Sequence, residues 1–154
     1  MEPRPKINSE MELDAAKTVA AKMGVADIDG TAESICAEYL YPMDGFELAK
    51  KLDRYQSWDT SREDMELLDE LDLHVSRSLR KAEKEWFERN NVKPPHPIGS
   101  RVKWRTITGV VEGIYEHGHG QYLVKPDIST IGDGRYIVNF EDVQLTTEAQ
   151  STPA

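Results

Sequence analysis

A proline-rich segment, Lys93–Pro97, divides this sequence of 154 residues into two parts with different hydrophobic periodicity. Proline lacks a backbone N–H and fixes φ, so the segment cannot continue a helix and favours an extended connector. Before it, apolar residues recur every three or four positions, as in helices; after it, they alternate with polar residues, as in strands. We therefore predict an α+β protein with a helical domain over residues 1–92, a connector over 93–98, a small β domain over 99–146 and a disordered tail over 147–154.

Four helices are expected before the connector. Gly24 is expected to end the first helix, because glycine readily adopts the left-handed conformation found there. Thr31 can cap a short second helix. Asp44 and Glu47 have the spacing of a capping box for a third helix, which should run from Gly45 to about residue 56.

The fourth predicted helix is the longest, running from a cap at Thr60 to about Asn90, with Glu63 completing a capping box. Its apolar residues recur at helical spacing and define one face: Leu68, Leu71, Val75, Leu79, Ala82 and Trp86. Acidic residues come first and basic residues last, which complements the helix dipole. Because a helical domain of this size has a marginal core, dimerisation through this helix is a further expectation.

The second part of the sequence predicts a small antiparallel barrel. Its five expected strands cover residues 101–105, 109–116, 121–125, 135–139 and 143–145. Glycines in His117–Gly120 favour a hairpin turn, because glycine tolerates positive φ. Asp127–Gly134 is a mostly polar loop, and Phe140–Asp142 is expected to form a tight turn.

Four short segments in this part carry a pattern known from other proteins: Ile98–Val102, Gly109–Ile114, Tyr122–Val124 and Phe140–Val143. Together they resemble a small Tudor/KOW-like barrel. The join, Trp86–Phe87 with Asn90–Gly99, is similar to small uncharacterised proteins encoded by phages and prophages. Proteins of that genomic setting often bind host machinery, and some inhibit CRISPR defence. The resemblance implies a binding function but transfers no functional residue.

The net charge of −9 belongs almost entirely to the first part. Residues 1–92 contain 13 basic and 21 acidic side chains, whereas residues 93–154 contain 6 and 7. An acidic surface opposes binding to nucleic acid or anionic lipid, because phosphate contacts need lysine and arginine. The helical part is therefore expected to bind protein, and only the barrel could bind nucleic acid.

The first candidate site is an acidic face on the long helix. Glu63, Glu66 and Glu70 fall within a narrow arc, roughly opposite the apolar face, and Asp59 would extend this arc if the helix starts early. One interpretation is a surface that imitates phosphates and occupies a basic nucleic-acid groove. The other is a solvated helix face at the favourable end of the dipole. The interpretation as a phosphate-imitating surface predicts a non-enzymatic phage or prophage accessory protein that inhibits a host nucleic-acid-handling complex, such as a CRISPR effector.

The second candidate site is a basic face on the first strand of the barrel. Arg101, Lys103 and Arg105 alternate with apolar residues, so they are expected to share one strand face, with Trp104 beside them. This pattern fits contact with a nucleic-acid backbone. It equally fits an edge strand protected from aggregation by its charge. A structural phage component that assembles through its helices is a third hypothesis.

Few residues indicate catalysis or metal binding. Cys36 is the only cysteine, so no intrachain disulfide can form, and its place on an apolar helix side is typical of a structural thiol. His117 and His119 could offer two metal ligands, but no third is expected nearby. We expect no enzyme, no metal and no cofactor. The polar N-terminus and the short apolar runs predict a protein of the host cytoplasm without a membrane partner.

Overall fold

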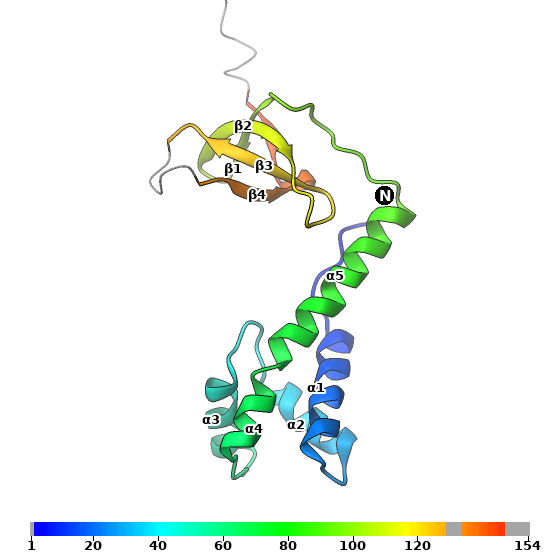
Figure 1. The fold of residues 1–154 in the computed structure, drawn as a ribbon, viewed down its shortest axis with the longest axis vertical. Helices are drawn as coiled ribbons and strands as arrows, with labels where there is room; N and C mark the ends of the chain where they lie inside the picture. The colour runs from blue at the N-terminus through cyan, green and yellow to red at the C-terminus, as the bar shows by residue number, and fades with distance from the viewer. Residues whose placement is uncertain (1, 129–133, 147–154) are drawn as a thin grey trace, which may run out of the picture. The chain divides into compact units, whose positions relative to one another are not determined.

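The computed structural model describes residues 2–128 and 134–146 (Figure 1). These residues form two compact units. The helical unit comprises Pro3–Glu83, and the sheet unit comprises Glu2 and the described residues from Lys84 onward. The predicted tail at 147–154 and positions 129–133 of the predicted loop lie outside the described residues. A mixed helix and sheet architecture is therefore confirmed.

Five helices precede the sheet: α1 (Ser9–Met23), α2 (Ile28–Glu38), α3 (Gly45–Tyr55), α4 (Arg62–Leu68) and α5 (Leu71–Arg89). Gly24 ends α1 with a φ of 73°, as predicted. Asp44 caps α3, where its Oδ1 accepts a hydrogen bond from the Glu47 N–H at 2.7 Å. The predicted cap at Thr31 is wrong, because Asp27, four residues earlier, caps α2 and accepts a hydrogen bond from the Gly30 N–H.

The predicted long helix is wrong in its first half, because α4 and α5 are separate helices that break at Asp69 and Glu70. The cap is also one residue later than predicted. Ser61 and Asp64 form the capping box, while the N–H and hydroxyl of Thr60 donate to Asp53. Thr60 is therefore bound to Asp53, and Ser61 is the residue that caps α4.

The helical unit has its own hydrophobic core. Its fully buried large side chains come from all five helices: Val19, Ile35, Leu48, Leu52, Leu68, Leu71 and Val75. Leu68, Leu71 and Val75 belong to the predicted apolar face, so that face is buried on both sides of the helix break. The apolar period continues across the break, which explains why the sequence pattern indicated one continuous helix.

The described part of the sheet unit contains five antiparallel strands: β1 (Arg101–Trp104), β2 (Ile107–Ile114), β3 (Gln121–Pro126), β4 (Tyr136–Asn139) and β5 (Gln144–Leu145). The order in the sheet is β4-β3-β2-β1-β5. Between β4 and β5 the chain makes one short turn of 3-10 helix, Phe140–Asp142, where a tight turn was predicted. Because β5 pairs with β1 and not with β4, the sheet is open, and the prediction of a closed barrel is wrong.

The end of α5 contributes to the core of the sheet unit. Trp86 and Val92 are buried in one cluster with side chains of the sheet. The fully buried Tyr122 of β3 fixes the proline-rich connector, since its hydroxyl donates to the His96 carbonyl oxygen and accepts from the His96 N–H, at 2.9 and 2.8 Å. The connector is thus part of this unit's packing.

Candidate functional site

The dense acidic run of residues 59–72 includes three carboxylates with structural roles. Asp64 completes the α4 capping box. Asp69 accepts a hydrogen bond from the Gly45 N–H at 2.8 Å. Asp72 accepts from the Met43 N–H at 3.1 Å and from the Tyr39 hydroxyl. Burial is the largest cause that raises the pKa of Tyr39, and the hydrogen bond to Asp72 adds to it. These contacts tie the loop between α2 and α3 to the break between α4 and α5.

The four predicted site residues are not on one helix. Asp59 precedes α4, Glu63 and Glu66 lie on α4, and Glu70 lies at the break before α5. Glu66 pairs with Arg62 at 3.5 Å and Glu70 with Lys22 at 3.4 Å. Both pairs are exposed enough that each contributes little stability.

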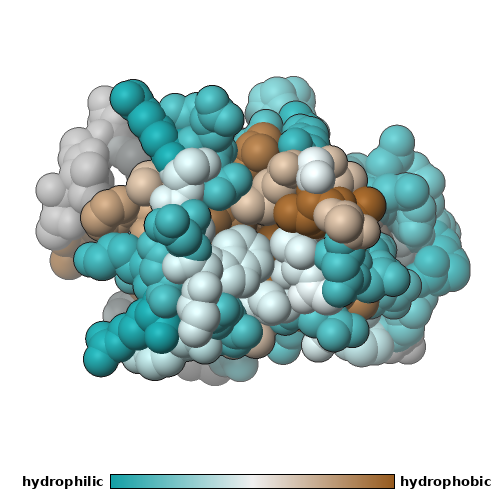
Figure 2. Space-filling model, turned by 90° about the horizontal axis from the view of Figure 1, so that it is seen from below, coloured by the Kyte–Doolittle hydropathy of each residue, from teal (hydrophilic) through white to brown (hydrophobic). Residues whose placement is uncertain are grey.

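Asp59 and Glu63 are exposed and have no cation partner among the residues that the structure describes. Figure 2 shows hydrophilic side chains around the margins of one face, with pale and hydrophobic side chains across its middle. Exposed acids without a counter-charge are the groups that a partner could neutralise.

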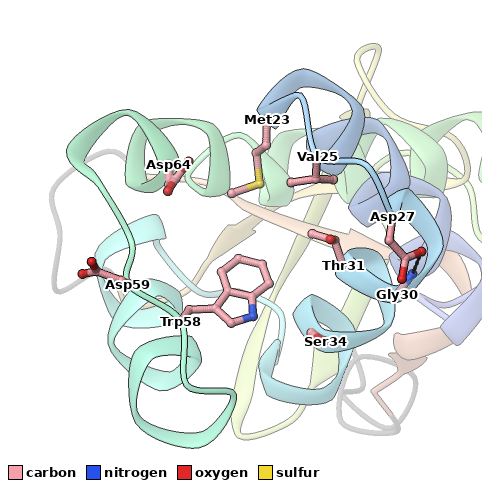
Figure 3. Close-up of a pocket in the computed structure, with 9 residues that line it drawn as sticks. All are labelled: Met23, Val25, Asp27, Gly30, Thr31, Ser34, Trp58, Asp59 and Asp64. Carbon is pink, nitrogen blue, oxygen red and sulfur yellow. Dashed lines mark hydrogen bonds between the residues drawn. The ribbon is translucent and has the colours of Figure 1, made fainter.

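A cavity of about 460 Å³ lies beside these acids, within the helical unit. We call it the Trp58 cavity, and its lining residues are Met23, Val25, Asp27, Gly30, Thr31, Ser34, Trp58, Asp59 and Asp64. They come from the end of α1, the start of α2 and the segment from α3 into α4. Figure 3 shows the Trp58 ring in the middle of this group, with the Met23 sulfur on one side of it and Ser34 on the other. Ser57, with a φ of 57°, precedes Trp58 at this turn.

A second cavity, of about 360 Å³, lies on the same unit. Asp44, Phe46, Met65, Glu66 and Asp69 line it. The Phe46 side chain is 56% exposed, and the Lys50 ammonium lies 4.9 Å from the centre of its ring. Residues of α4 thus contribute to both cavities, and both combine an aromatic ring with carboxylates.

Sequence reasoning found the acidic residues but missed Trp58 and Phe46 as parts of a site. Phe46 is an apolar residue within the predicted third helix, and helical periodicity alone does not tell an exposed apolar side chain from a buried one. Trp58 follows directly after a predicted helix and precedes an aspartate. An aromatic residue in a polar segment between helices was the signal that could have indicated a cavity wall.

The predicted basic face does not extend to Arg105. Arg101 and Lys103 lie on β1, but β1 ends at Trp104, and Arg105 lies in the two-residue turn to β2 with a φ of 55°. Its guanidinium lies 4.8 Å from the centre of the Trp104 ring. β1 is also not an edge strand, since it pairs with β2 on one side and with β5 on the other.

The charge of that face is partly neutralised. The guanidinium of Arg101 forms an ion pair with the Asp127 carboxylate. This contact, with the Thr108 hydroxyl as a second donor, lowers the pKa of Asp127. Lys103 is exposed, and Trp104 packs against Tyr136 with 5.6 Å between ring centres. The structure therefore leaves Lys103 and Arg105 as the exposed bases here.

The remaining candidates, Cys36, His117 and His119, each pack against other side chains. Cys36 packs against the helical core, and burial raises the pKa of its thiol, with a further contribution from the charge of Glu12. His119 packs against Phe87, and His117 against Tyr115. Within residues 2–128 and 134–146, no group of three His, Cys, Asp or Glu side chains is placed to hold a metal ion. Among the described helices, none combines the length and apolar character needed to cross a membrane.

No protein-family profile, curated protein sequence or solved structure matches this chain.

Proposed function

We propose that this chain is a non-enzymatic binding protein whose acidic helical unit binds a basic surface on another protein or nucleoprotein complex. The observation that carries the proposal is the pair of exposed carboxylates, Asp59 and Glu63, of which Asp59 also lines the Trp58 cavity. Other acids of the same run serve caps and loop contacts, which supports a separate role for these two. Carboxylates that lack a counter-ion gain most when a partner supplies one.

The narrower form of the proposal is inhibition. Carboxylates spaced along a surface imitate the phosphates of a nucleic acid and can occupy its groove on a host complex, such as a CRISPR effector. This form rests on the resemblance to phage and prophage proteins that the sequence around the connector suggested. It predicts that nucleic acid and this protein compete for the same basic groove.

Partner capture tests the proposal. The full chain with an affinity tag is incubated with bacterial lysate, and the bound proteins are identified by mass spectrometry. The variant Glu63→Lys with Glu66→Lys should lose the captured complex, because it reverses charge on α4. The matched control is Glu85→Lys with Glu88→Lys, which makes the same charge change at exposed positions of α5 in the sheet unit.

Capture of a basic or nucleoprotein complex by the wild type and the control, but not by the α4 variant, supports the proposal. Equal capture by the α4 variant and the wild type overturns it. Addition of nucleic acid as a competitor distinguishes the general binding proposal from the narrower proposal of inhibition. A complex that resists competition is bound elsewhere than in its nucleic-acid groove, which overturns the inhibitory form.

A second candidate function is nucleic-acid binding by the sheet unit. The exposed Arg105 lies beside the Trp104 ring, which packs against Tyr136, and stacking rings with a nearby cation suit single-stranded nucleic acid. Titration of a labelled single-stranded RNA at several salt concentrations tests it. Binding should weaken as salt rises and with Trp104→Ala. Lack of binding at low salt rejects this function.

A further inference from the structure

The Trp58 cavity combines an aromatic wall with apolar and hydroxyl groups. Its volume of about 460 Å³ falls within the range of roughly 300–1,000 Å³ typical of ligand pockets. Met23 and Val25 give apolar surface, and Thr31 and Ser34 give hydroxyls. The indole N–H of Trp58 has no hydrogen-bond partner within the described part of the chain, and Figure 3 shows this nitrogen on the Ser34 side of the ring. The walls of this pocket therefore offer contacts to a group with both apolar and polar parts.

The carboxylates of the cavity have no cation of their own. Asp27, Asp59 and Asp64 line it, and none of them is in an ion pair with another described residue. Asp27 and Asp64 each use one oxygen to accept a backbone N–H at a helix start, at 2.9 and 3.1 Å. Their other oxygens, Oδ2 and Oδ1, have no hydrogen-bond partner in the described ranges. Three negative groups without a counter-charge make a cationic occupant the complementary one.

The side chains that line the cavity indicate which kind of cation would bind there. The acids of this cavity are not close enough together to form a metal site, as noted above, and a bare ion would not use the tryptophan ring. A guanidinium is flat, stacks on an aromatic face and donates several hydrogen bonds in fixed directions. Its aliphatic stem can pack on apolar surface such as Met23 and Val25. We propose that the Trp58 cavity binds the side chain of an arginine that the partner protein presents.

This assignment rests on the proposed function and gives it a specific contact. Asp59 belongs both to the cavity lining and to the exposed acids, so the cavity adjoins the acidic surface. A basic partner would spread its charge over Glu63 and Glu66 and insert one arginine beside Trp58. The acids outside the cavity then attract the partner, and the cavity selects the arginine.

The experiment follows the Trp58 indole N–H by NMR in the full chain during titration with N-acetyl-arginine amide. Trp58→Phe identifies this signal by its loss. The arginine amide should move the signal, the lysine amide should move it less, and the citrulline amide, which is uncharged, should leave it in place. Ser34→Leu, which fills the cavity from α2 and keeps the tryptophan, should weaken arginine binding by about three- to tenfold. Unchanged amide signals of α1–α4 would verify its fold.

The outcomes separate this inference from the proposed function. If Ser34→Leu lowers both arginine binding and partner capture, the assignment is supported. If the arginine amide leaves the Trp58 signal unmoved, or moves it no more than citrulline amide does, the cavity assignment is overturned. An equal response to lysine and arginine overturns the choice of arginine. Capture that depends on Glu63 and Glu66 but not on Ser34 also overturns the cavity assignment, and it leaves the proposed function standing.

Discussion

At the scale of single residues, Cys36 shows how burial determines reactivity. The thiol packs against the helical core, and its raised pKa lowers the fraction of thiolate at any pH below that value. We expect Cys36 to react several-fold more slowly with a disulfide reagent at neutral pH than free cysteine does. The rate should rise as the pH increases through the alkaline range, because the thiolate is the reacting form.

Unfolding provides the control for this prediction. In denaturant the burial is lost, so Cys36 should react like a free cysteine, and Cys36→Ala should show no reaction under either condition. A folded protein that reacts at the free-cysteine rate at neutral pH would show that the thiol is not protected. It would also reopen the possibility of a reactive thiol.

Tyr122 is a second residue whose single polar atom has a clear structural role. Tyr122→Phe removes both hydrogen bonds to His96 and leaves two backbone groups of the connector without this partner. An unsatisfied, partly buried polar group costs about 1–3 kcal/mol. We expect a loss of stability of this size in chemical denaturation. Tyr136→Phe is the matched control, because the Tyr136 hydroxyl makes no hydrogen bond to another described residue. This variant should change stability little.

At the scale of secondary-structure elements, Gly45 sets the distance between α3 and α4. A Cβ at this position would lie 2.3 Å from the Met65 carbonyl oxygen and 2.6 Å from the Asp69 backbone nitrogen. Both atoms are backbone, so the helices would have to move apart. We expect Gly45→Ala to reduce the free energy of unfolding by about 1–3 kcal/mol, as overpacking typically does.

Gly113→Ala is the control, since a Cβ on Gly113 meets nothing within 4 Å. It should be neutral or slightly stabilising, because alanine lowers the entropy of the unfolded chain. Thermal unfolding followed by circular dichroism measures both variants. If Gly45→Ala were as stable as Gly113→Ala, the close approach of α3 to α4 would be incorrect.

The same scale shows what the sequence could predict and what it could not. Local signals predicted several element ends: the Gly24 stop, the Asp44 cap and the glycine-rich hairpin after β2. The helix break at Asp69 could not be predicted in this way, because the apolar period continues from Leu68 to Leu71. The break serves long-range contacts, from Asp69 to Gly45 and from Asp72 to the loop before α3. Such partners are far apart in sequence and invisible to a periodicity argument.

The candidate site follows the same division. The sequence shows the acidic composition of residues 59–72. It does not show which of these carboxylates accept hydrogen bonds at helix caps and loops. That distinction depends on partners such as Ser61 and Gly45, which only the folded chain supplies. The two cavities were not predicted, since each is lined by residues from several segments. The first strand was predicted to extend one residue too far, to Arg105. The turn at this residue has no sequence signal as clear as an Asn-Gly pair.

At the scale of the whole molecule, two separate hydrophobic cores stabilise the chain. Leu52 is fully buried in the core of the helical unit, and Val111 is fully buried in the core of the sheet unit. Helix α5 belongs to both units, since its residues up to Glu83 lie in one and those from Lys84 in the other. Each unit is therefore expected to respond mainly to changes in its own core.

Leu52→Ala tests this independence. Removing a buried leucine side chain costs about 2–5 kcal/mol, a large part of the stability of a small unit. Hydrogen exchange should become faster in α1–α4, while the amides of β2 and β3 keep their protection. Val111→Ala should have the opposite distribution, with faster exchange in the sheet and unchanged protection in α1–α4. If either variant accelerated exchange equally in both units, α5 would couple them into one cooperative structure, and a partner bound to the acidic helices would then stabilise the sheet as well.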